Sequence, residues 1–107
     1  MSEPASFTSS IAARYALAVF EIAQEADQVA DLEKNIDVLS EVLDTSEDFN
    51  AMLKSPLLSR GAQGQAIAAV ASKLRLSEDL SNTLALMASK RRLFVVPALI
   101  GQLRALI

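Results

Sequence analysis

The 107 residues are the length of one ordinary domain, and just over half of them are apolar while only five are aromatic. There is no Cys, which excludes disulfides and Cys-ligated metals, and no His, which removes the usual general base and the commonest metal ligand. The net charge of −3 hides a split, because residues 1–50 carry a net charge of −9 and residues 51–107 carry +6.

The composition favours helices, since three Gly and three Pro are few for a sandwich or barrel. No apolar run approaches the roughly eighteen residues of a membrane span, and the first ten residues do not resemble a secretory signal. We therefore expect a soluble protein of a reducing compartment. The charge split indicates acidic early helices packed beside basic late ones, or an acidic face and a basic rim offered to a partner.

The first helix is predicted to run to about Glu25, with Ser9 or Ser10 as its N-cap. Residues 1–8 show no pattern that ties them to the rest of the chain, so they are expected to be mobile.

This helix is apolar over more of its circumference than one buried face requires. At about 100° per residue its polar side chains share one narrow stripe, whereas one buried face needs only about 100° of apolar surface. Two apolar sides remain, one formed by Ala13, Ala16, Leu17, Phe20 and Ala23, and the other by Ile11, Tyr15, Ala18, Val19 and Ile22. The helix is either surrounded by its own domain, or it packs inward on one face and receives a partner helix on the other.

Two amphipathic segments follow. A second helix is predicted at 28–44, with acids on a solvated face opposite the apolar one. A short third helix is predicted at 46–54, after a capping-box-like pair, Thr45 and Asp48, and it ends before Pro56. Their expected inward residues are Val29, Leu32, Ile36, Leu39, Leu43, Phe49, Met52 and Leu53.

A fourth helix is predicted at 60–74, with Ser59 as its N-cap. Gly61 and Gly64 each weaken its first turns by about 1 kcal/mol relative to Ala. They do not form a phosphate loop, because no strand precedes them and no Gly-Lys-Ser/Thr follows, and they indicate close helix packing or a frayed start. The apolar stripe of this helix comprises Ala62, Ala66, Ile67, Val70, Ala71 and Leu74.

A fifth helix is predicted to start after Ser77, its N-cap, and to run to about Lys90, with the bases at 90–92 complementing its C-terminal end. Leu86 lies about 120° from the core face of this helix and is a candidate groove wall beside the surplus face of the first helix. That core face comprises Leu80, Leu84, Met87 and Ala88.

The last predicted helix spans about 93–105, and Pro97 is tolerated only in its first turn. The chain then ends on Leu106 and Ile107 without a polar tail, which indicates a fragment whose next segment is missing. We expect residues 1–107 to form a single all-α domain, a compact bundle of about six helices.

Catalytic chemistry has little support in this sequence. The hydroxyls have neither a His nor a Ser-x-x-Lys motif to activate them, and the carboxylates lie on helix exteriors or at helix starts. We predict no catalytic residue, no metal or cofactor site and no small-molecule substrate, although a cleft between helices could still pair two carboxylates for acid catalysis. Nucleic-acid binding is supported only by the bases at 90–92 and Arg104, and the acidic pI argues against it.

Three segments occur in an order and at separations that match a known family: ARYALAVFEIA at 13–23, Ser-Pro at 55–56 and RRLFVVP at 91–97. Together they resemble the N-terminal domain of the δ subunit of bacterial F-type ATP synthase, which is equivalent to the mitochondrial oligomycin-sensitivity-conferring protein. The Gly-containing start of the fourth helix departs from this family, whose members usually show a charged helical start there.

The resemblance implies a six-helix bundle that sits on the catalytic head of ATP synthase and performs no chemistry of its own. It implies binding of the N-terminal helical segment of an α subunit in a groove between the first and fifth helices. A C-terminal region, absent here, would engage the b subunits, so that the whole subunit is a stator connector for proton-driven ATP synthesis. The implied location is peripheral, at the cytoplasmic face of the bacterial inner membrane.

The family groove coincides with the surplus face of the first helix and with Leu86 of the fifth. Tyr15 supplies a broad apolar face with a hydroxyl, and Leu86 fills a gap between the apolar anchors of the partner helix. The predicted partner-binding residues are Ile11, Tyr15, Ala18, Val19, Ile22, Thr83, Leu86 and Lys90. The alternative is a self-associating helical bundle that dimerises through the extra apolar face of the first helix.

Overall fold

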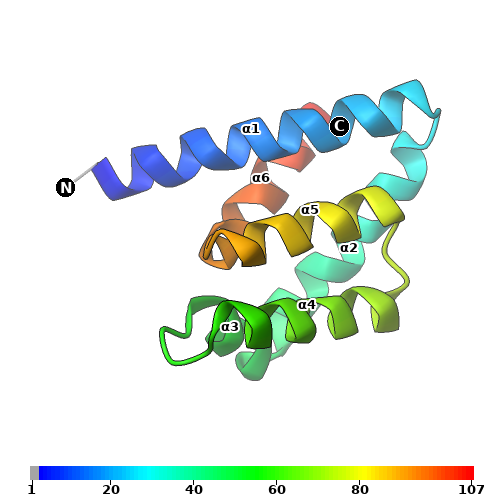
Figure 1. Ribbon diagram of the computed structural model, residues 1–107. Helices are drawn as coiled ribbons and strands as arrows, with labels where there is room; N and C mark the ends of the chain where they lie inside the picture. The colour runs from blue at the N-terminus through cyan, green and yellow to red at the C-terminus, as the bar shows by residue number, and fades with distance from the viewer. Residues whose placement is uncertain (1–2) are drawn as a thin grey trace.

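The computed structural model describes the backbone of residues 3–107 and the side chains of residues 7–107. This part of the chain folds into an all-α bundle of six α-helices and one short 3-10 turn (Figure 1). The elements are α1 (Glu3–Glu25), α2 (Val29–Thr45), α3 (Glu47–Lys54), α4 (Arg60–Leu74), α5 (Glu78–Ser89), η1 (Leu93–Val95) and α6 (Val96–Leu106). Among the described helices, none combines the length and the apolar character that crossing a membrane requires.

The predicted helix boundaries are confirmed to within one residue for α2 to α5, but the start of α1 was predicted wrongly. The helix begins at Glu3 rather than after Ser9 or Ser10, so residues 3–8 are helical and not an irregular segment; residues 1–2 lie outside the described part. The sequence held a signal for this start, because Glu3 and Pro4 are residue types that the first helical turn favours.

The last helix also differs in detail from its prediction. The segment begins with the 3-10 turn η1 at Leu93 and becomes α-helical at Val96, with Pro97 in the first turn as expected. A 3-10 start tightens the entry into α6, and Pro97 loses nothing there because its missing N–H would have no intrahelical acceptor.

The cap of α3 is Ser46, whose Oγ accepts a hydrogen bond from the N–H of Phe49 at 3.1 Å. Thr45 was therefore predicted wrongly as the capping residue. It ends α2, and its Oγ1 donates a hydrogen bond to the carbonyl of Glu41 at 2.9 Å. Thr45 is thus the last residue of α2, and Ser46 is the N-cap of α3.

Ser46→Ala is expected to lower the free energy of unfolding by about 1 kcal/mol, because it removes the acceptor of an N–H at the start of α3. Thr45→Ala is the matched control and is expected to change it by less than about 0.5 kcal/mol, since this side chain is exposed and only bonds back within its own helix. Urea unfolding followed by far-UV circular dichroism measures both. Equal losses in the two variants would contradict the role of Ser46.

Three helices end with a non-glycine residue in the left-handed region, where glycine is usual. Asp27, Arg75 and Arg91, which follow α1, α4 and α5, have φ values of 58°, 56° and 59°. Each turn has the double hydrogen bond of a Schellman motif; after α1, for example, the N–H of Gln28 bonds to the carbonyl of Ala23 at 2.7 Å. A left-handed φ is locally strained for a non-glycine residue, so glycine is favoured at each position unless the side chain makes a contact that glycine cannot.

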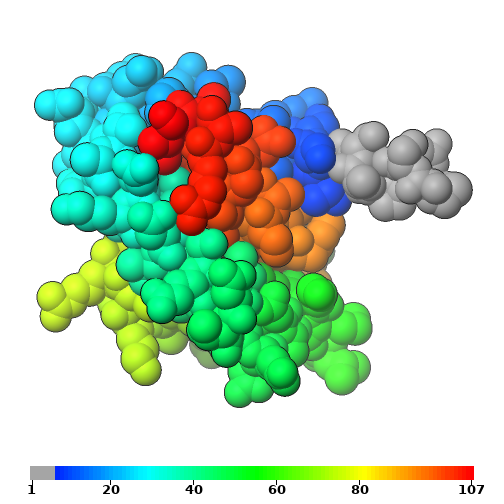
Figure 2. Space-filling model, turned by 180° about the vertical axis from the view of Figure 1, so that it is seen from behind, coloured from blue at the N-terminus to red at the C-terminus, as the bar shows by residue number. Residues whose placement is uncertain are grey.

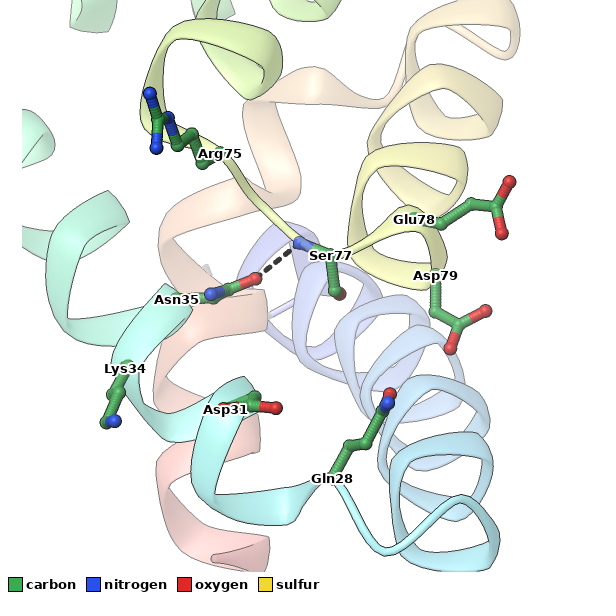
Figure 3. Close-up of a pocket in the computed structure, with 8 residues that line it drawn as sticks. All are labelled: Gln28, Asp31, Lys34, Asn35, Arg75, Ser77, Glu78 and Asp79. Atoms are coloured by element: carbon green, nitrogen blue, oxygen red, sulfur yellow. Dashed lines mark hydrogen bonds between the residues drawn. The ribbon is translucent and has the colours of Figure 1, made fainter.

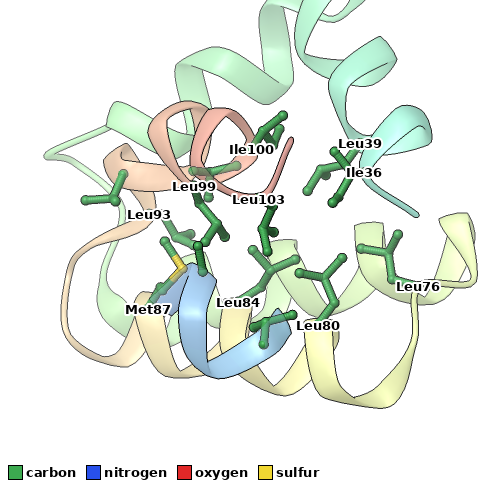
Figure 4. Packing of buried hydrophobic residues seen from close by; sticks show 14 of the residues in the cluster. Ile36, Leu39, Leu76, Leu80, Leu84, Met87, Leu93, Leu99, Ile100 and Leu103 are labelled. Atoms are coloured by element: carbon green, nitrogen blue, oxygen red, sulfur yellow. The ribbon is translucent and has the colours of Figure 1, made fainter. Parts of the chain in front are cut away.

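The core forms where α6 passes between α1, α2 and α5. α1 packs most extensively against α6, and α4 against α5. Figure 4 shows leucines of α5 and α6 facing one another, with Ile36 and Leu39 of α2 closing one side. The predicted inward residues of α5 are confirmed as buried: Leu80, Leu84, Met87 and Ala88.

Seen from behind, the C-terminal part of α6 reaches the surface next to α2 (Figure 2). There Arg104 and Asp37 form an ion pair at 3.0 Å between two exposed side chains. Such a pair contributes only ~0–1 kcal/mol, so α6 is held mainly by its buried apolar face.

The glycines of α4 are not explained by close packing, which corrects one of the two expectations for them. A Cβ at Gly64 would meet no atom within 4 Å, and one at Gly61 would meet only the Oγ of Ser59 at 3.8 Å. α4 nevertheless starts at Arg60 as predicted, because the Oγ of Ser59 accepts a hydrogen bond from the N–H of Ala62 at 3.0 Å.

Candidate partner-binding groove

α1 and α5 contact one another and run in opposite directions on one side of the bundle (Figure 1). The first half of α1 therefore faces the end of α5. A hollow of about 260 Å³ opens between them, and it is lined by Phe7, Ile11, Arg14, Tyr15, Leu86, Lys90 and Arg92.

The core-facing stripe of α1 takes residues from both of the predicted faces. It comprises Ile11, Ala12, Ala16, Val19 and Ala23. The flanks of this stripe remain open, with Ile22 45% exposed on the α5 side and Leu17 48% exposed on the other. The expectation of one inward and one outward face is thus corrected: the inward stripe lies between two narrower apolar flanks.

Four of the predicted site residues are brought together in the hollow: Ile11, Tyr15, Leu86 and Lys90. Ile11 is buried and forms the floor, Tyr15 is half-buried, and Leu86 is 47% exposed. Leu86 thus stands beside the ring of Tyr15 with nearly half of its surface available to a ligand.

Three predicted residues lie outside the lining of this hollow. Ala18 and Ile22 are exposed and follow Tyr15 on the same flank of α1 at helical spacing. Thr83 is half-buried one turn before Leu86, and its Oγ1 already donates to the carbonyl of Asp79 at 2.9 Å. These residues can extend the two walls, but Thr83 offers its methyl group rather than a free hydroxyl.

Val19 departs from the prediction, because it is 1% exposed and belongs to the core. It lies in the middle of the stripe of α1 that faces the bundle interior, where α6 packs across the helix. A partner therefore cannot touch Val19 without opening the domain.

Arg92 connects the two walls of the hollow. Its Nη1 donates a hydrogen bond to the Oη of Tyr15 at 3.2 Å, although the two residues are 77 positions apart in the chain. This contact holds the phenol ring in place at the groove and sets a guanidinium beside it.

The neighbouring Arg91 turns away from the groove, which corrects its expected role at the end of α5. Its guanidinium donates to the carbonyl of Leu58, to Oε1 of Gln63 at 3.3 Å and to the carbonyl of Pro56 at 3.4 Å. Gln63 is 4% exposed and donates in turn to the carbonyl of Met52 at 3.1 Å. Arg91 therefore fastens the turn between α3 and α4 to the end of α5.

Phe7, Arg14 and Arg92 line the hollow but were not predicted as site residues. Phe7 was missed because it fell in the segment expected to precede the helix. Arg14 lay on the polar stripe of α1, and Arg92 was assigned to the end of α5. The sequence spacing could not show that Arg14 and Arg92 both lie near Tyr15, because Arg92 reaches Tyr15 through the turn after α5.

Comparison with known proteins identifies the fold family. A family model described as ATP synthase delta (OSCP) subunit matches residues 11–107 of this chain. The chain belongs to the ATP synthase delta (OSCP) subunit family.

Curated relatives agree with this assignment. Proteins named ATP synthase subunit delta are 56% identical over 105 residues in Ruegeria sp. (strain TM1040), 51% over 107 residues in Roseobacter denitrificans and 52% over 107 residues in Dinoroseobacter shibae. The alignments cover 98%, 100% and 100% of this chain but 56%, 58% and 58% of the relatives. The chain thus spans little more than half the length of these δ subunits.

The described residues that line the groove suit it for binding a polypeptide segment. They supply apolar floor and walls, one phenol and three cations, with no carboxylate among them. Within the described part of the chain no group of three or more His, Cys, Asp or Glu is placed to hold a metal ion. An amphipathic helix, which offers apolar anchors and polar edges together, is the ligand class that fits this lining.

Proposed function

We propose that this chain is a non-catalytic stator component of F-type ATP synthase and binds the N-terminal helix of an α subunit between α1 and α5. Membership of the δ (OSCP) family supports the assignment to the complex. The observation that carries the groove is the meeting of Tyr15 and half-exposed Leu86, on two antiparallel helices, above a floor formed by Ile11. A docked helix would bury these side chains as anchors.

We further propose that residues 1–107 are the N-terminal domain of the subunit, and that a C-terminal region engages the b subunits of the peripheral stalk. The greater length of the δ subunits to which the chain is similar supports this division. The complete subunit then links the catalytic head to the stalk at the cytoplasmic face of the membrane, as a peripheral protein. Holding torque requires a slow off-rate, which depends chiefly on fully desolvated anchors.

Leu86→Glu and Tyr15→Ala are each expected to weaken binding of the α-subunit peptide by more than about tenfold, or ~1.4 kcal/mol. The first change places a charge against the apolar face of the partner, and the second removes the ring that packs beside it. Titration of a fluorescent peptide, made from the α-subunit N-terminus of the same organism, measures both.

Leu17→Glu is the matched control for Leu86→Glu. Leu17 is equally exposed, at 48% against 47%, but it lies about 200° around α1 from Tyr15. We expect the affinity of Leu17→Glu for the peptide to stay within about twofold of that of the parent. Far-UV circular dichroism should show unchanged helicity in every variant. Unchanged affinity in Leu86→Glu would remove the groove assignment.

The alternative is a homodimer closed through the extra apolar face of α1, the flank on which Ile22 is 45% exposed. Sedimentation velocity at micromolar concentration separates the two proposals. A monomer that binds the peptide supports the groove, whereas a tight dimer that Ile22→Glu dissociates supports self-association.

A further inference from the structure

The groove between α1 and α5 is charged differently at its two ends. At the end of α5, the hollow beside Leu86 is lined by three cations, Arg14, Lys90 and Arg92. No carboxylate lines this hollow among the described residues, and the ion pair found among them, Arg104 with Asp37, lies elsewhere. The cations at this end are therefore not neutralised by the described side chains of the domain.

The opposite end, at the start of α5, is acidic. A narrow cleft beside Val19 and Ala23 of α1 is lined by Asp31 and Asp79 and by no base. It adjoins a larger polar hollow of about 490 Å³ between α2 and α5, where Glu78 adds a third carboxylate (Figure 3).

Two bases, Lys34 and Arg75, also line the larger hollow, but they stand on the side away from α1 (Figure 3). In the same hollow, Asn35 holds the start of α5 in place: its Oδ1 accepts a hydrogen bond from the N–H of Ser77 at 2.6 Å (Figure 3). This end therefore presents carboxylates to a ligand lying along α1 and α5.

Arg92 is built to receive an anion at the basic end. Its hydrogen bond to Tyr15 uses one N–H and a neutral acceptor, so the guanidinium keeps its charge and most of its five donors for a ligand. The side chain is half-buried, which weakens solvent screening relative to a fully exposed arginine. Lys90 and Arg14, both exposed, add longer-range attraction at the rim.

We propose that the groove selects the direction of the bound helix by its charges. Carboxylates of the bound helix lie over Arg14, Lys90 and Arg92, and bases of the bound helix lie toward Asp79. Arg92 is the specificity-determining residue, because its guanidinium is held at the groove by Tyr15 and keeps donors for a carboxylate of the ligand. This inference rests on the proposed function, since it takes an α-subunit helix as the occupant. The oppositely charged ends then fix the direction in which that helix docks, which uniform apolar walls cannot do.

A double-mutant cycle on the 107-residue chain tests this inference. The probes are the α-subunit N-terminal peptide and a copy whose Asp and Glu residues are replaced by Asn and Gln. Neutralising the peptide is expected to weaken binding to the parent about tenfold, but to weaken binding to Arg92→Gln only about twofold. Binding of the unmodified peptide to the parent is expected to weaken as salt is raised, and this dependence should be flatter in Arg92→Gln.

Three further variants keep the test independent of folding. Lys90→Gln removes an exposed charge that makes no hydrogen bond through its side chain, and it should show the same coupling at about half the size. Arg75→Gln, at the far end of α5, is the matched control and should discriminate between the two peptides as the parent does. Arg92→Lys keeps the charge and should restore most of the salt dependence.

The outcomes separate the two proposals. If Leu86→Glu abolishes binding while Arg92→Gln and Lys90→Gln discriminate between the peptides as strongly as the parent, the charge-order inference is overturned and the groove stands. If Leu86→Glu has no effect either, the groove itself is overturned along with the inference.

Discussion

Leu84→Ala is expected to lower the free energy of unfolding by about 2–5 kcal/mol. Leu84 is 0% exposed and lies at the centre of the cluster where α5 meets α6 (Figure 4). Truncating it removes buried methyl groups and leaves a space that the surrounding leucines can fill only in part. Chemical denaturation followed by far-UV circular dichroism gives the difference directly.

Leu86 provides the matched comparison, because it lies two residues further along the same helix and is 47% exposed. Leu86→Ala is expected to cost less than about 1 kcal/mol of stability, since nearly half of the Leu86 side chain is already exposed to solvent in the folded protein. Truncating Leu84 should thus lower stability, whereas Leu86 should matter mainly for binding. Equal destabilisation by the two changes would contradict the division of α5 into a core face and a groove face.

Arg91→Gly and Arg75→Gly are expected to shift stability in opposite directions, although both replace an arginine whose φ lies near +60°. Glycine relieves the left-handed backbone in each case, which favours folding by about 0.5–1 kcal/mol. Arg75 is exposed, and its guanidinium has no hydrogen-bond partner among the described side chains and backbone, so only the gain from the relieved backbone is expected.

Arg91 gives the opposite result because its guanidinium bonds to Gln63 and to the carbonyls of Leu58 and Pro56. Losing these contacts should outweigh the backbone gain and lower the free energy of unfolding by about 1–2 kcal/mol. Thermal unfolding of the two variants and the parent measures the difference. A stabilised Arg91→Gly would show that the contacts to the α3–α4 turn contribute less than the relief of the left-handed backbone, and would contradict the prediction.

Local signals were sufficient for most of the helices. Ser59 and Ser77 cap α4 and α5 through their Oγ atoms as predicted, and the apolar spacing of α2 gave its buried residues. These features depend on neighbours within one or two turns, which the sequence displays directly. The start of α1 was missed because residues 3–8 lack a strong apolar period, and the first-turn signal of Glu3 and Pro4 was overlooked.

The groove could be predicted only in part. The surplus apolar surface of α1 and the off-face position of Leu86 correctly brought Tyr15 and Leu86 together. Periodicity measures how wide an apolar surface is, but not which part of it α6 will cover, and so Val19 was misplaced. Arg92 could not be found at all from spacing, because the left-handed turn at Arg91 decides where the two arginines point.

The packing of α1 against α6 has a consequence for biosynthesis. α1 is synthesised early, yet its main packing partner is separated from it by four other α-helices. The apolar stripe of α1 therefore lacks its main packing partner until α6 has been synthesised, and part of its apolar surface stays exposed during that time. The hydrogen bond between Tyr15 and Arg92 likewise forms only after the chain has been synthesised as far as residue 92.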